Sequence, residues 1–199
     1  MLAGLIRCGP MRDGPDLPPA AGPAALAALL VIDAFLLPRL PIRPISGIAD
    51  ETAHAATAVA LLAALPPPAD REFARGFAAG SILLDVDHVP ELWGRRWLRP
   101  RGVRPLPHSL ALPALLVVHG VRRSNRAALG AAMGLGGHLL RDLATGNTAV
   151  PLLWPLTKRP FSVRYRKYVA VMAVLAAVGA SRRQPAFPPP APPPAPAGT

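Results

Sequence analysis

"AALGAAMGLGGHLLRDLAT", residues 127–145, is a long apolar run made mostly of alanine, glycine and leucine. Alanine and leucine favour helices over strands, so the run predicts a helix. Its polar residues gather in the last part, where His138 and Asp142 are four positions apart and therefore share one helical face. This spacing is typical of two ligands for one metal ion, and equally of a hydrogen bond between the two side chains.

The rest of the chain has the same apolar, helix-favouring composition. Hydrophobic residues make up 51% of the 199 residues and charged residues only 17%, with a mean hydropathy of +0.32. These values are too apolar for a typical soluble domain and point toward the membrane. Proline clusters separate the apolar segments. We therefore predict an all-α fold, a membrane-associated bundle of about six apolar helices, at residues 24–37, 53–65, 73–86, 109–121, 127–145 and 168–180.

The composition divides the chain into three regions. Residues 1–23 are rich in proline and glycine and should be irregular, residues 24–181 should form the helical membrane domain, and residues 182–199 should form a disordered Pro/Ala-rich tail. No helix contains eighteen uncharged apolar residues, so we expect some to cross a membrane with the help of snorkelling arginines and others to be partly embedded. The first helix contains Asp33 and lacks a cleavage site, which favours a retained helix over a signal peptide.

Alternating helices would bring four of the five histidines and three carboxylates to one end of the bundle. The second helix would begin near His54, the third would end at the D-x-D-H motif of residues 85–88, and His108 would open the fourth. Ionisable groups in membrane-depth segments are costly and point to function. The residues expected at this end are His54, Asp85, Asp87, His88, His108, His138 and Asp142.

Imidazole and carboxylate ligands without thiolate suit a divalent ion, zinc first, with manganese or iron as alternatives. Asp50 and Glu51 precede His54 closely and could orient its ring. Ordinary structural roles remain open: Asp85 could cap its helix or pair with an arginine. His119 lies at the other end of its helix and is expected to be a core or interface residue.

The net charge of +11 comes almost entirely from arginine. Two basic clusters, at residues 95–104 and 158–167, would lie at the same end as the histidines. They are typical of headgroup anchoring, and also of a site that attracts a phosphate-bearing substrate. We therefore expect membrane lipids and an anionic small molecule or lipid as partners, and no nucleic acid. The sequence does not determine the oligomeric state.

Three blocks carry a family resemblance: LLDVDHVPELWG (83–94), PHSLALPALLVV (107–118) and GLGGHLLRDLATGNTAVPLLWPLTKRPFSV (134–163). In this order they resemble the YdjM-type family of LexA-regulated, inner-membrane-associated metal-dependent hydrolases. The resemblance implies a multi-pass inner-membrane protein whose metal ligands are the seven residues named above. One departure is clear: Val103 and Pro105 stand where the family commonly has histidine and glycine, which implies one ligand fewer, a different metal occupancy or an inactive relative.

Together these patterns predict a membrane-bound hydrolase in which a metal-activated water attacks a phosphoester, with lipid-linked phosphoesters among the candidates, or an acyl substrate. Asp87 would be a ligand or general base, and Arg104 would stabilise an anionic transition state. The alternative is a non-catalytic membrane scaffold or regulatory protein with a structural or vestigial metal site. An ion or solute transporter is disfavoured, because the polar residues are expected at helix ends and not at helix centres.

Overall fold

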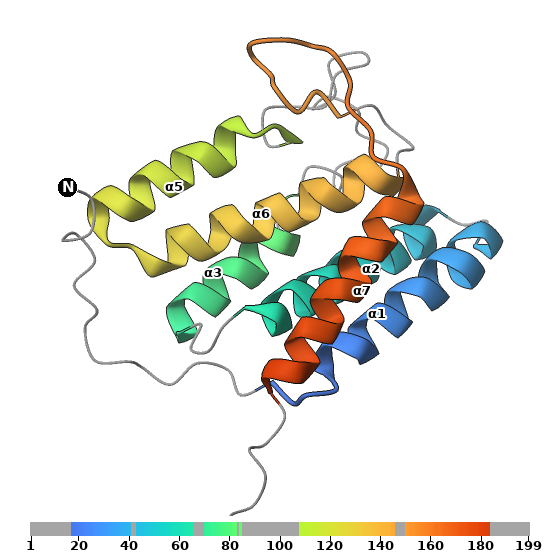
Figure 1. Cartoon of the computed structure of the whole chain (residues 1–199). Coiled ribbons are helices and arrows are strands. Elements are labelled where there is room, and N and C mark those ends of the chain that lie inside the picture. Colours follow the sequence, from blue (N-terminus) through green and yellow to red (C-terminus); the bar gives the residue numbers. More distant parts are fainter. Residues whose placement is uncertain are drawn as a thin grey trace, which may run out of the picture.

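The computed structural model describes residues 17–40, 43–65, 70–82, 84, 108–145 and 150–183. In these residues the chain is helical apart from turns and one isolated antiparallel bridge between Val150 and Phe161, which confirms the predicted all-α fold (Figure 1). A π-helical turn, η1 (Ile32–Leu36), and a 3-10 turn, η2 (Leu37–Arg39), extend the first helix. The α-helices are α1 (Ala21–Val31), α2 (Arg43–Ala64), α3 (Arg71–Ile82), α5 (Ala111–Arg123), α6 (Arg126–Thr145) and α7 (Tyr165–Arg182).

The largest difference from the predicted helix boundaries lies in α2, which begins at Arg43 and not near residue 53. The prediction treated the prolines before residue 45 as helix breakers. Pro44 is in fact the second residue of α2, and a proline is tolerated in the first turn because its missing N–H would have no partner there. As a consequence, His54 lies in the middle of a long helix.

The helices form two groups that meet along α2 and α6. In the first group α6 packs against α3 on one side and α5 on the other (Figure 1). In the second group α2 packs against α1 and α7, and it also contacts α3 and α6. The α6 helix is therefore surrounded by other helices, and half of its residues are buried, including His138, Arg141 and Asp142.

The contact between α3 and α6 is a close approach of two backbones, made possible by paired glycines. Gly76 and Gly80 on α3 lie against the Ala127 and Ala131 carbonyl oxygens. Gly130 and Gly134 on α6 lie in the same way against the main chain of α3, so a Cβ at any of the four would overlap backbone atoms of the partner. Small residues four apart are typical of helix packing in membranes, where close backbone contact replaces the hydrophobic driving force.

A polar contact joins the first turns of α3 and α6. Asp70 Oδ1 accepts a hydrogen bond from the Phe73 amide at 2.7 Å and caps α3, while Asp70 Oδ2 accepts one from Arg126 Nε at 2.7 Å. Partial burial opposes ionisation of this carboxyl, but the two interactions outweigh it and lower the pKa of Asp70. The carboxylate is therefore held in its charged form at neutral pH.

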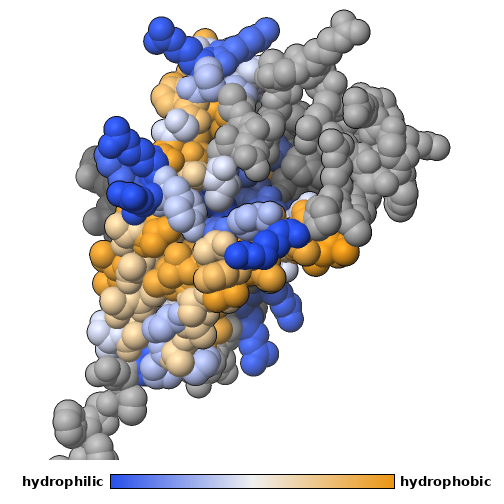
Figure 2. Space-filling view, turned by 90° about the vertical axis from the view of Figure 1, so that its right-hand side faces the viewer, coloured by the Kyte–Doolittle hydropathy of each residue, from blue (hydrophilic) through white to orange (hydrophobic). Residues whose placement is uncertain are grey.

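Large apolar side chains cover much of the outer surface. Figure 2 shows them as a band over one face, with strongly hydrophilic side chains above and below it. Exposed examples are Phe35 in η1, Leu115 and Val121 on α5, and Val174 on α7. Within the described residues, one continuous helical segment, Ala21–Arg39, is long and apolar enough to cross a membrane by length and composition. The number of such segments is therefore smaller than the six apolar helices of the sequence prediction.

Candidate metal centre

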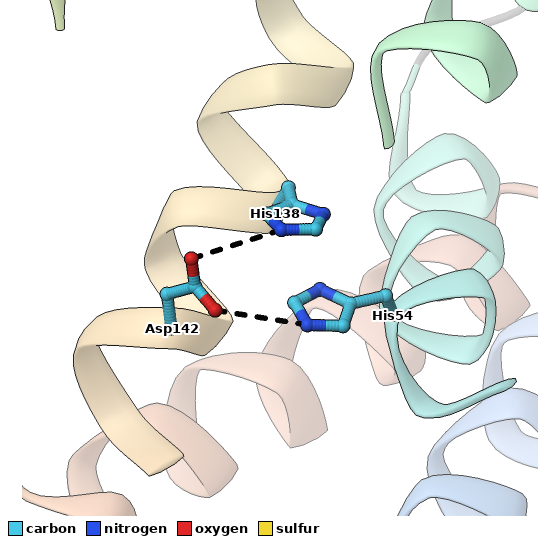
Figure 3. Close-up of side chains that lie close together, drawn as sticks. All are labelled: His54, His138 and Asp142. Carbon is cyan, nitrogen blue, oxygen red and sulfur yellow. Dashed lines mark ion pairs between the residues drawn. The ribbon is translucent and has the colours of Figure 1, made fainter. Parts of the chain in front are cut away.

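The site is built on the last two turns of α6. Asp142 follows His138 by one helical turn, and His138 Nε2 lies 3.7 Å from Asp142 Oδ2. Both residues are buried, with exposed fractions of 2% and 7%. Figure 3 shows the two side chains turned toward the same space, which the His54 ring enters from α2. The expected one-face arrangement of His138 and Asp142 is therefore present.

The orientation of His138 is fixed by α3. Its Nδ1 lies 2.8 Å from the carbonyl oxygen of Ser81, and because a carbonyl can only accept, Nδ1 carries the proton. The neutral ring then has its lone pair on Nε2, the nitrogen that faces Asp142. A histidine that ligates a metal commonly donates its other N–H to a carbonyl in this manner, which sets the tautomer and the ring angle.

His54 reaches the site from the middle of α2. Its ring stacks on that of His138, with the ring centroids 3.8 Å apart and 15° between the planes. His54 Nε2 lies 3.7 Å from Asp142 Oδ1, so the two histidines approach different oxygens of one carboxylate. The prediction that His54 joins this cluster is correct, but its predicted place at the start of a helix is wrong, since α2 begins eleven residues earlier.

His108 approaches from the segment that precedes α5. It is fully buried, and its Nε2 lies 3.9 Å from Asp142 Oδ2. The segment is held in place by the Leu110 amide, which donates to the Leu152 carbonyl oxygen at 2.8 Å. Three histidines therefore surround a single carboxylate. His119 lies outside this cluster, but it is exposed on α5, whereas the sequence predicted a core or interface residue.

The donor set and its spacing fit a divalent metal ion. One ligand atom from each of His54, His138 and Asp142 can be chosen so that all three lie within 4.8 Å of one another. Two ligand atoms on one tetrahedral zinc ion are about 3.3 Å apart, given bond lengths of about 2.0–2.1 Å. The N–O separations of 3.7–3.9 Å exceed this spacing by only about half an ångström and are longer than ordinary hydrogen bonds.

A second polar cluster lies beside the site, and sequence reasoning did not find it. The Arg141 side chain is fully buried and donates to both oxygens of Asp33, at 2.8 and 3.0 Å, and to Asp50 Oδ1 at 2.9 Å. Asp50 therefore binds Arg141, whereas the sequence suggested a role in orienting His54. The only signals were single charges in apolar runs, and nothing in the sequence pairs Asp33 with a residue 108 positions away.

Four residues assigned from the sequence, Asp85, Asp87, His88 and Arg104, lie outside the described residues, as does Val103. The described chain leads directly to and from this segment. Leu84 packs in the cluster formed by Leu135, Leu139, Leu143 and Val150, and the chain resumes at His108. Of the seven expected ligands, the structure thus brings together His54, His108, His138 and Asp142.

Comparison with protein families decides the membership of the chain. The family model of the YdjM inner membrane protein matches residues 50–188, which is more than half of the chain. The chain belongs to the YdjM inner membrane protein family. This confirms the family resemblance seen in the sequence. Neither the curated proteins nor the solved structures give a match.

The YdjM match includes every residue of the metal centre and excludes the first helix. His54, His108, His138 and Asp142 all lie between residues 50 and 188. The α1 helix and Asp33 precede the matched range, although Asp33 binds Arg141 inside it. The family description places YdjM proteins in the inner membrane, in agreement with the apolar outer surface of the bundle.

Proposed function

We propose that this YdjM protein is a multi-pass inner-membrane hydrolase that depends on a divalent metal ion, zinc first, with manganese or iron as alternatives. The observation that carries the proposal is the buried cluster of His54, His138 and Asp142, with His108 directed at the same carboxylate. Burying this many ionisable groups is costly unless they are paired or bind a metal. Their position inside the bundle, away from its apolar surface, supports a dedicated site.

Helix lengths support several crossings of the membrane. The α2, α6 and α7 helices contain 22, 20 and 18 residues. At about 1.5 Å per residue they are roughly 27–33 Å long, close to the thickness of the hydrocarbon core of a bilayer, about 30 Å. In α6 the polar residues that lower the hydropathy, such as Arg141 and Asp142, are buried, so they would not meet lipid. We propose that these three helices cross together with Ala21–Arg39.

Each residue of the centre has a proposed role in the reaction. His54, His108, His138 and Asp142 would hold the ion, and Ser81 would keep His138 in the required tautomer. A divalent ion in this position would lower the pKa of a water molecule and polarise the phosphoryl or acyl oxygen. By family motif, Asp85 and His88 would complete the ligand set, Asp87 would serve as ligand or general base, and Arg104 would stabilise the anionic transition state.

A phosphoester, either part of a lipid or free in solution, is the substrate class that we propose. The basic segment, residues 158–167, carries five exposed cations: Lys158, Arg159, Arg164, Arg166 and Lys167. This part of the chain is attached next to the site, because the Val163 amide donates to the Leu143 carbonyl oxygen at 2.7 Å, one residue after Asp142. Exposed cations beside a metal centre would attract a phosphate group, and at headgroup depth a phospholipid would supply one.

Metal analysis of the purified full-length protein tests the site. Wild type should retain zinc or another divalent ion in stoichiometric amounts, whereas His138→Ala and Asp142→Ala should lose it. His119→Ala is the matched control, because it removes an exposed histidine outside the cluster and should keep the metal. A wild type without specific metal, or equal metal in all four proteins, would refute the assignment.

Turnover then separates the hydrolase from the non-catalytic alternative. Wild type and His119→Ala should hydrolyse phosphomonoester or phosphodiester substrates, presented both in solution and as phosphatidic acid vesicles, and His138→Ala should not. Activity on vesicles alone would favour a lipid substrate. Bound metal without turnover on any substrate would favour a structural site in a scaffold protein, the outcome that the departure at Val103 suggests.

A further inference from the structure

The most extensive polar network in the described part of the chain, apart from the metal centre, is organised around Arg141. Its guanidinium group is fully buried and binds Asp33 through both terminal nitrogens and Asp50 through one. Tyr165 of α7 also joins this network, since its hydroxyl donates to Asp33 Oδ2 at 2.7 Å. Arg141 of α6 thereby links η1 to α2, and α7 joins them through Asp33.

This network and the metal centre form two parallel connections between α2 and α6. On α2, Asp50 and His54 are four residues apart and share one face. On α6, their partners Arg141 and Asp142 are adjacent in sequence. The Arg141–Asp50 contact thus lies one turn of α2 from the His54–Asp142 contact. A slide or rotation of α2 that broke the first would also displace the His54 ring from its 3.8 Å stack on His138.

Stability alone is a poor reason for this arrangement. Moving a guanidinium and a carboxylate out of water carries a large desolvation cost for each ion, and apolar residues of similar size are often as stable or more stable. The better attested use of a buried ion pair is to select one register among several. Asp33 also lies in a π-helical turn, a rare conformation that is frequent at functional sites, and in the segment apolar enough to cross a membrane.

We propose that Arg141 and Asp33 are positioning residues: Asp33 holds the Arg141 guanidinium, whose contact with Asp50 fixes α2 against α6 in the register that places His54 beside His138 and Asp142. The effect on metal binding rests on the proposed metal site. The contacts among η1, α2 and α6 do not depend on it. It gives a function to the first helix, which lies outside the residues matched to the YdjM family. The helix would hold the register of the metal centre from a distance, without contributing a ligand.

The experiment compares Asp33→Asn, Arg141→Met and the double variant in full-length protein in detergent. Each single variant should lower the melting temperature, because it leaves a buried polar partner behind. The double variant removes both charges and should recover much of that loss. Its zinc affinity, measured by competition with a chelator, should nevertheless stay about 10–100-fold below wild type, the loss typical for supporting residues of metal sites.

The matched control is an ion pair at the other end of α6. The double variant Asp70→Asn/Arg126→Met removes a 2.7 Å pair whose arginine is 47% exposed, twelve residues and about 18 Å along the helix from His138. It should bind zinc as wild type does. If the Asp33→Asn/Arg141→Met protein recovers its melting temperature and also binds zinc with wild-type affinity, the network is merely structural and the proposal is wrong.

A readout without metal keeps the two proposals separate. In metal-free protein with labelled histidines, the His54 and His138 ring resonances should shift in the Asp33→Asn/Arg141→Met variant, while that of exposed His119 should not. Unchanged His54 and His138 resonances would overturn the positioning role even if wild type binds zinc. Shifted resonances in a protein that binds no zinc would support the positioning role and refute the metal-dependent function.

Discussion

Gly134 is the position where a single methyl group should disturb both the fold and the metal centre. It lies on α6, one turn before His138, and a Cβ there would overlap the Phe77 carbonyl oxygen and approach the Ser81 amide nitrogen and Oγ to 2.9 Å. Backbone atoms cannot turn aside as a flexible side chain can. In the Gly134→Ala variant, α3 and α6 would therefore have to separate by on the order of 1 Å.

The expected magnitude follows from three contributions. Overpacking costs about 1–3 kcal/mol, and alanine recovers about 1 kcal/mol through its higher helix propensity. The separation would also lengthen the 2.8 Å contact between His138 Nδ1 and the Ser81 carbonyl oxygen, with a further loss of about 1 kcal/mol. The free energy of unfolding should fall by roughly 1–3 kcal/mol. Zinc affinity should fall about 10–100-fold, because His138 loses the partner that orients it.

Gly136, two residues further along α6, is the matched control because a Cβ there has no atom within 4 Å. Gly136→Ala should raise the free energy of unfolding by up to about 1 kcal/mol and leave zinc affinity unchanged. Denaturant unfolding followed by circular dichroism, together with zinc titration, measures both quantities for both variants. If Gly134→Ala proves as stable as Gly136→Ala and binds zinc equally well, the close approach of α3 and α6 does not support the site as described.

Two further predictions concern contacts outside the metal centre. Since the pKa of Asp70 is lower in the folded protein than its ordinary value near 3.8, its carboxylate contributes stability above about pH 4 and loses that contribution as the pH falls through the folded pKa. The gap in melting temperature between wild type and Asp70→Asn should therefore be full at pH 7 and should close in acid; a constant gap would contradict the ion pair with Arg126. Thr57 Oγ1 lies 2.8 Å from the Ala53 carbonyl oxygen and 2.6 Å from the Tyr168 hydroxyl, all in the buried core. Tyr168→Phe should lower the free energy of unfolding by about 0.5–1.5 kcal/mol in denaturant titrations, and no change would indicate that Thr57 is equally well paired without it.

The sequence was sufficient for those parts of the site that depend on local spacing. His138 and Asp142 share a face because four residues make about one helical turn, whatever surrounds the helix. The convergence of His54 and His108 on them was also predicted, from the alternation of helices. For His54, however, the reasoning used a helix that began near residue 53, whereas α2 begins at Arg43. The earlier start of the helix leaves its neighbours unchanged, but it moves His54 from the predicted helix end to the middle of α2.

The contacts that hold the site together could not be predicted, because they depend on which helices become neighbours. The glycines of α3 and α6 show the small-residue spacing in the sequence, but the sequence does not identify their partner helix. The same holds for Arg141, which has two carboxylates on different elements within 3.0 Å. The sequence shows that charged residues lie within apolar segments, but it does not show that Asp33 and Asp50 bind Arg141.

The distribution of polarity explains why hydropathy alone identifies a single membrane segment. In a water-soluble bundle, charged residues would face outward and large apolar ones inward. Here Arg141 is fully buried, while Leu115 and Val121 are 63% and 66% exposed on α5. A hydropathy average over a window counts the buried Arg141 and Asp142 of α6 in the same way as exposed charges, and so gives a lower hydropathy than the exposed side chains alone would give. Buried ionisable groups together with large exposed apolar side chains are typical of helix bundles in membranes, and both features agree with the inner-membrane location of the family.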